Sequence, residues 1–76
     1  MKKYELLYRV QITKSPEMAP ESIEFIIATK KKLMKDYELT EREWQSIMRS
    51  KEKLLYDADL WFGGTVEHRI VGKVKG

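Results

Sequence analysis

The densest run of charge in the sequence is a group of lysines that could bind phosphate. Lys30, Lys31 and Lys32 are consecutive, and Lys35 follows three residues later. Ammonium groups at this density neutralise phosphates in a nucleic acid or at a membrane surface. The same lysines would also suit a solvated loop or an edge strand, where they discourage pairing between sheets. Both interpretations stay open.

A second basic group is interleaved with apolar side chains near the C-terminus. The residues predicted to share the outer face of a C-terminal hairpin include Phe62, Arg69, Val71 and Lys73. Basic residues beside an aromatic ring on a sheet can bind single-stranded nucleic acid by stacking and phosphate contacts. Glu67 lies in the middle of this face, and an ordinary exposed strand would show the same pattern.

One histidine–carboxylate pair could act in catalysis. If the chain turns at Gly63 and Gly64, Asp59 lies opposite His68, and a carboxylate can orient an imidazole as a general base. No serine, cysteine or second carboxylate is predicted beside the pair, so we interpret it as a structural hydrogen bond. The acidic residues match no metal-binding spacing, and no glycine-rich phosphate loop is present. We therefore expect no catalytic residue, no metal and no cofactor.

The size of the chain limits what it can enclose. It has 76 residues and no cysteine, so we expect one domain over residues 1–76, without disulfides or thiolate metal sites. A core of this size is only marginally stable. Self-association, as a homodimer for example, would add stability. The net charge of +3 favours anionic partners weakly.

Two periodic segments predict one strand and one helix. Residues 3–13 alternate apolar and polar side chains, which is typical of a strand. Thr40 and Glu43 form a capping-box pattern before apolar residues at helical spacing, so a helix is predicted over 41–56. The two prolines in residues 14–21 indicate a loop.

Residues 20–35 fit two structures. The β-branched residues of 22–29 favour a strand, but Pro20 could also begin a second helix that spans residues 20–35. The glycine pair predicts a two-residue hairpin between strands 57–62 and 65–74. In that register Trp61 shares an apolar face with Val66, His68, Ile70 and Val74.

These elements predict an α+β fold. A small antiparallel sheet of strands 3–13, 22–29, 57–62 and 65–74 would carry the amphipathic helix 41–56 on one face. The core would place Trp44 of the helix against Trp61 and Ile70 of the sheet.

Part of the C-terminal half resembles a known group of proteins. The run Leu39–Ile47 (LTEREWQSI) and the run Trp61–Val66 (WFGGTV) are similar to segments of small accessory proteins from phages and prophages of Gram-positive bacteria. The resemblance implies an early-expressed protein that binds a host or phage macromolecule, and it implies no enzymatic residues. The loop at residues 14–21 departs from the compact hairpin expected of that group.

The sequence therefore predicts a non-enzymatic interaction protein. We expect it to bind and inhibit a bacterial host or defence protein in the cytoplasm, without a membrane partner, since no stretch approaches the roughly 18 apolar residues of a membrane span. The alternative is a nucleic-acid-binding module that uses the lysine cluster and the basic hairpin face. A steep salt dependence of binding would identify the second function.

Overall fold

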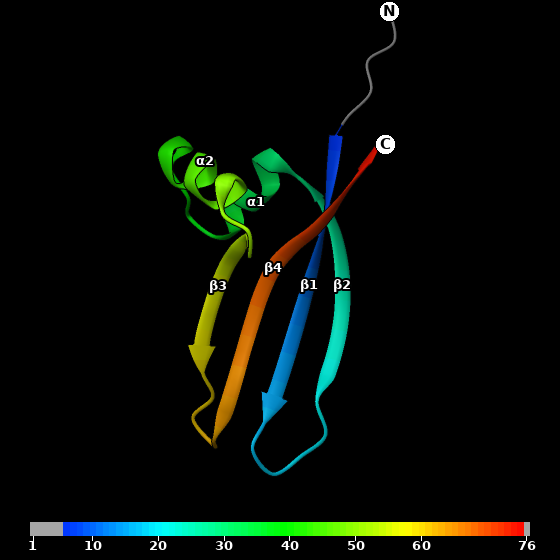
Figure 1. The fold of residues 1–76 in the computed structure, drawn as a ribbon, viewed down its shortest axis with the longest axis vertical. Helices are drawn as coiled ribbons and strands as arrows, with labels where there is room; N and C mark the ends of the chain where they lie inside the picture. The colour runs from blue at the N-terminus through cyan, green and yellow to red at the C-terminus, as the bar shows by residue number, and fades with distance from the viewer. Residues whose placement is uncertain (1–5, 76) are drawn as a thin grey trace, which may run out of the picture.

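The computed structural model describes residues 6–75 as one antiparallel sheet with two helices (Figure 1). The elements in chain order are β1 (Leu6–Pro16), β2 (Ser22–Thr29), α1 (Lys30–Asp36), α2 (Glu41–Arg49), β3 (Leu54–Asp59) and β4 (Gly64–Lys75). The strand order is β2-β1-β4-β3, so the first and last strands pair at the centre, and β2 and β3 form the edges. The predicted α+β fold with one antiparallel sheet is confirmed.

The first two strands are both present, but β1 continues to Pro16, three residues beyond its predicted end and into the predicted loop at 14–21. Tyr8 and Val10 point to one face of β1 and are buried, whereas Arg9 points to the other face and is exposed. β1 pairs with β2 from Leu7 to Lys14 without interruption. The predicted strand at 22–29 is confirmed, and residues 3–5 of the predicted first strand lie outside the described residues.

A threonine caps the N-terminus of each helix. The hydroxyl of Thr29 accepts a hydrogen bond from the N–H of Lys32 at 3.1 Å. Thr40 and Glu43 form the predicted capping box, with bonds of 3.1 and 2.8 Å. These bonds satisfy N–H groups that a helix terminus otherwise leaves unpaired. The second helix exists, but it spans residues 30–36 and follows the strand instead of replacing it.

The helices cover one end of one face of the sheet. The core cluster consists of Tyr8, Val10, Ala28, Leu33, Trp44, Leu55 and Ile70. The rings of Tyr8 and Trp44 meet edge to face with centroids 5.1 Å apart. The molecule measures 52 × 24 × 21 Å, so the sheet extends well beyond the helices. We call the two ends of the sheet the helix end and the tip end, where both hairpin loops lie (Figure 1).

The helix α2 ends earlier than predicted, at Arg49 instead of residue 56. Ser50 adopts extended backbone angles, and its hydroxyl accepts hydrogen bonds from the N–H groups of Glu52 and Lys53. Leu54 and Leu55 then join β3, where Leu55 is buried. Their apolar side chains therefore belong to the sheet and not to a continuation of α2.

The last hairpin has a longer loop than predicted. β3 ends at Asp59, which pairs with Thr65 and not with His68. The N–H of Leu60 donates to the carbonyl of Gly64 at 2.9 Å, so the residues between them form the turn. Trp61 therefore belongs to the loop, and its predicted place in the core is wrong.

A bulge in β4 changes which side chains share a face. Ile70 pairs with Val10, whereas Gly72 pairs with Arg9, so Val71 is an extra residue. An extra residue reverses the alternation for everything that follows it.

The bulge corrects the predicted positions of two side chains. Lys73 pairs with Tyr8 and shares the helix-covered face with Ile70, so its predicted place beside Phe62 and Arg69 is wrong. Val74 lies on the opposite, helix-free face and not with Ile70.

Within residues 6–75, neither helix has the length and apolar character needed to cross a bilayer.

Candidate functional site

Three exposed apolar side chains project from the tip end, and we call them the aromatic tip: Met18, Trp61 and Phe62. Their exposed fractions are 91%, 94% and 53%. The rings of Trp61 and Phe62 meet edge to face with centroids 5.4 Å apart. Large aromatic side chains supply most of the binding energy in many protein interfaces. The tip therefore presents the chemistry of a protein-binding anchor.

Hydrogen bonds hold the two loops of the tip end together. The N–H of Glu17 donates to the carbonyl of Gly63 at 3.1 Å, which links the β1–β2 loop to the β3–β4 loop. The hydroxyl of Ser15 donates to the carboxylate of Glu21 at 3.0 Å. A side chain at Gly64 would press on the carbonyl of Ser15, so this close approach requires glycine. A loop fixed in this way loses little conformational entropy on binding.

Charge is divided between the two ends of the molecule. The tip half, residues 12–25 and 56–68, contains six acidic residues and one lysine, Lys14. Residues 30–53, which form the helix end, contain eight basic and five acidic residues. A partner at the aromatic tip would therefore meet an acidic rim, and a partner at the helix end would meet a basic surface.

A second apolar surface lies on the edge strand β2. Ile23, Phe25 and Ile27 form a row on the helix-free face, and we call this row the β2 stripe. Their exposed fractions are 52%, 56% and 53%. Each pairs with a polar residue of β1, namely Thr13, Gln11 and Arg9, and stays half exposed.

The predicted lysine cluster lies on α1, and two of its four members are paired. The Nζ of Lys30 is 2.7 Å from the Oε1 of Glu41, and it lies 5.8 Å from the ring centroid of Trp44. The Nζ of Lys32 is 3.1 Å from the Oδ2 of Asp36. These ion pairs neutralise part of the positive charge that would otherwise be available to bind phosphate.

The other two lysines of the cluster are exposed. Within residues 6–75, no ion pair involves Lys31 or Lys35. Both line a shallow hollow of about 350 Å³ together with Thr29, Lys32 and Asp36. The cluster thus offers two unpaired cations to a ligand, fewer than the sequence predicted.

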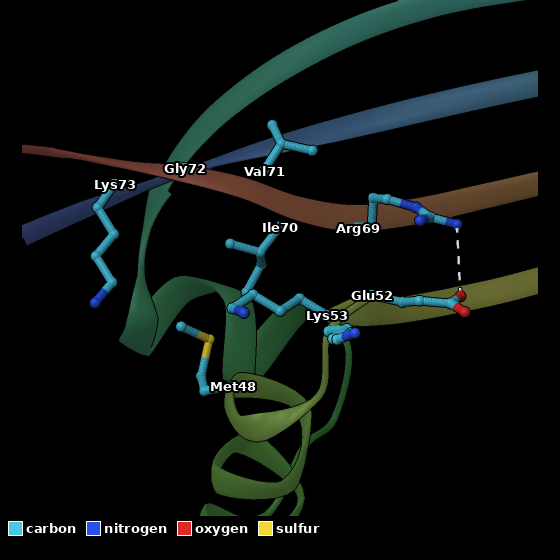
Figure 2. Close-up of a pocket in the computed structure, with 9 residues that line it drawn as sticks. Met48, Glu52, Lys53, Arg69, Ile70, Val71, Gly72 and Lys73 are labelled. Carbon is cyan, nitrogen blue, oxygen red and sulfur yellow. Dashed lines mark ion pairs between the residues drawn. The ribbon is translucent and has the colours of Figure 1, made fainter.

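A groove at the helix end collects other basic residues (Figure 2). β3 begins at Leu54, opposite Arg69, so the part of β4 beyond Ile70 has no neighbouring strand on this side. The groove has a volume of about 390 Å³. Its charged lining residues are Lys51, Glu52, Lys53, Arg69 and Lys73. We call it the basic groove.

The bulge is what brings Lys73 into this groove. Figure 2 shows Lys73 and Ile70 on the side of the helices and Val71 pointing away from them. Arg69 is held by Glu67 at 2.9 Å and by Glu52 at 3.9 Å. The predicted basic face is therefore divided, since Phe62 lies at the tip end and the other three residues line the groove.

His68 pairs with a tyrosine instead of the predicted aspartate. The hydroxyl of Tyr37 lies 2.6 Å from the Nδ1 of His68, and Tyr56 packs edge to face on the same imidazole. Burial lowers the pKa of His68 below its ordinary value, with a further lowering from Lys14. Burial also raises the pKa of the Tyr37 hydroxyl. The lowered pKa of His68 and the raised pKa of Tyr37 both favour the neutral form of this pair near pH 7.

This environment supports a structural role for His68. The side chain packs with Tyr37 and Tyr56 where β3 and β4 meet α1. Asp36, Glu38 and Leu55 complete the lining of the adjoining hollow. The hydrogen bond between Nδ1 and the Tyr37 hydroxyl ties the imidazole to the C-terminal end of α1.

Sequence reasoning missed Met18 and Trp61 as surface residues. The signal was available for Trp61, because Leu60, Trp61 and Phe62 are three consecutive apolar residues before a glycine pair. A strand with one polar face does not carry such a run. Met18 lies in the loop between two prolines, and nothing in its spacing distinguishes it.

Among the described residues, no group of three or more histidine or carboxylate side chains is placed to hold a metal ion. No family model, curated protein or solved structure matches the chain.

Proposed function

We propose that the chain is a non-enzymatic interaction protein that docks its aromatic tip into a pocket of a partner protein. The observation that carries this proposal is the almost complete exposure of Trp61 on a loop fixed by hydrogen bonds. An exposed tryptophan contributes nothing to the core of a small domain. When it is buried at an interface, it removes a large apolar area from water.

The rim of the tip defines the chemistry of the partner. Glu17 and Glu21 lie in the β1–β2 loop, and Asp59 ends β3 just before the other loop of the tip end. Charge complementarity then favours a partner pocket with an apolar floor and a basic rim. The same acidic residues disfavour an anionic lipid surface as the binding site of the tip.

The resemblance to phage accessory proteins is the basis for proposing a class of partner. It favours a protein of the bacterial host or its defence systems, in the cytoplasm, as the molecule that is bound and inhibited. The small size of the chain fits inhibition by occupation of a site on the partner.

Affinity capture from a bacterial lysate with matched variants tests this proposal. The immobilised wild type should retain one protein in stoichiometric amount, and the double variant Trp61→Ala and Phe62→Ala should lose it. Tyr56→Ala removes a half-exposed aromatic ring away from the tip and should retain the partner. Equal capture by all three proteins would refute the role of the tip.

A second candidate function is nucleic-acid binding at the helix end. The specific observation in its favour is the basic groove, which the bulge at Val71 completes with Lys73. Binding of labelled oligonucleotides should then weaken with salt, with a log–log slope of about −0.7 to −0.9 per phosphate contacted. The double variant Lys51→Ala and Lys73→Ala should reduce that slope, and the absence of any binding at low salt would exclude this function.

A further inference from the structure

The two edges of the sheet are protected very differently. β3 has six residues, a register shift at Leu55, and the acidic side chains of Asp57 and Asp59. Charges, bulges and short length are the features by which edge strands avoid pairing with other chains. β3 is therefore protected against pairing with a strand of another chain.

β2 is less protected, because Glu24 near its start is its one charged residue. It has eight residues and pairs with β1 without a register shift. Residues 25–29 carry no charge, and the β2 stripe lies exposed beside the unpaired edge. Figure 1 shows no element on the outer side of β2. Such an edge is suited to accept another strand.

We infer that the strand accepted at this edge is β2 of a second copy, in antiparallel orientation. An antiparallel pair with two-fold symmetry keeps each face of the sheet continuous, because residues opposite each other share a face. Ile23, Phe25 and Ile27 of one copy then adjoin the same residues of the other copy. The two stripes bury each other in one apolar patch on a sheet that runs through both molecules.

The charge distribution favours a second copy of this chain as the partner, and it favours the antiparallel over the parallel orientation. Glu21 and Glu24 lie at the start of β2, and Lys31 and Lys35 follow its end. Antiparallel pairing therefore places the acidic tip half of each copy beside the basic helix end of the other. Parallel pairing would place like charges together, which disfavours association. An unrelated strand from another protein would have to reproduce the same charge gradient.

This arrangement goes beyond the proposed function. It leaves Trp61, Phe62 and the basic groove uncovered, since they lie on the β3–β4 side of the sheet, away from the outer edge of β2. It also places the two aromatic tips at opposite ends of the dimer, so the assembly presents two binding anchors.

The mass of the full chain in solution tests the inference. Sedimentation over a range of about 1–200 µM should show a rise from one copy to two, as expected for a contact at the small end of stable interfaces. Phe25→Lys places a charge in the middle of the stripe and should stay monomeric throughout. Val71→Lys makes the same change at an exposed position on β4 and should dimerise like the wild type. Circular dichroism checks that both variants are folded.

A charge exchange tests the direction of pairing with variants at exposed positions. One variant carries Glu21→Lys and Glu24→Lys, and the other carries Lys31→Glu and Lys35→Glu. Each should be monomeric alone, and their equimolar mixture should form a heterodimer, while the wild type dimerises and loses affinity as salt is raised.

Three outcomes would overturn the inference. These are a monomeric wild type at every concentration, a Phe25→Lys variant that dimerises normally, or charge variants that dimerise alone. Trp61→Ala should leave the monomer–dimer transition in sedimentation unchanged. A failure of the tip proposal can therefore be distinguished from a failure of the dimer proposal. A wild type that is monomeric but whose partner capture depends on Phe25 would assign the edge to another protein instead.

Discussion

Replacing Gly64 with alanine would test whether the close approach of two strands fixes the tip end. The added Cβ would lie 2.7 Å from the Cα of Pro16 and 2.8 Å from the backbone N of Glu17. Carbon atoms pack at about 3.5–4.0 Å, so the two backbones would have to separate by about 1 Å. The φ of Gly64 is also +103°, which an alanine rarely adopts.

The expected cost follows from these two effects. A strained φ/ψ combination costs about 1–3 kcal/mol. Inserting a methyl group into a packed region costs about 1–3 kcal/mol more. We expect the free energy of unfolding to fall by about 2–6 kcal/mol. A chain of 76 residues has a total of about 4–11 kcal/mol, so the variant should be severely destabilised.

Two other glycines provide matched controls. Gly72 has no atom within 4 Å of an added Cβ, so Gly72→Ala should change the stability by less than about 1 kcal/mol. Gly63→Ala should be intermediate, because its closest neighbour is the flexible carboxylate of Glu17 but its φ is +99°. Urea unfolding followed by circular dichroism measures all three. A Gly64→Ala variant within about 0.5 kcal/mol of Gly72→Ala would refute the reasoning.

Four further predictions concern the core, a helix cap and a titrating group. Burial lowers the pKa of His68 below 6.5, so the unfolded chain binds the proton more readily than the folded chain. The free energy of unfolding should therefore be highest above about pH 7 and fall as the pH drops through 6.5. Urea titrations at a series of pH values measure this change. Tyr37→Phe removes the 2.6 Å hydrogen bond to that imidazole and should cost about 0.5–1.5 kcal/mol, measured by the same titration at pH 7. Leu33→Ala empties a fully buried site and should cost about 2–5 kcal/mol, seen as a large drop in Tm. Thr40→Ala breaks the capping box of α2 and should cost about 0.5–2 kcal/mol, whereas Thr65→Ala at an exposed strand position should cost less.

The elements that the sequence predicted correctly are those with a strong local signal. The alternation along β1 and the Thr40–Glu43 capping box each depend on neighbouring residues alone, and both are confirmed. The strand at 22–29 was favoured by β-branched residues, and the structure forms it there. The fold class follows from these elements, because a sheet with one apolar face needs a helix to cover it.

The parts that failed depend on contacts between distant segments. Val71 becomes a bulge because Ile70 and Gly72 pair with adjacent residues of β1, and no local pattern encodes that choice. Trp61 is expelled from the core because Asp59 pairs with Thr65, which lengthens the loop. The predicted basic hairpin face was the least accurate part. The extra residue at Val71 moved Lys73 to the other face of the sheet, and the longer loop placed Phe62 at the tip end.

On the proposed function, exposed apolar surface and divided charge are the features that would let so small a chain bind selectively. The core cluster uses one end of one sheet face, so the tip and the β2 stripe remain for contacts with other molecules. If the stripes pair two copies, each dimer carries two aromatic tips. A target with two matching pockets is then held at both, and the second contact forms at the high effective concentration set by the rigid sheet between them. Modest affinity at each tip thereby becomes tight binding, and a target with a single pocket gains nothing from the pairing.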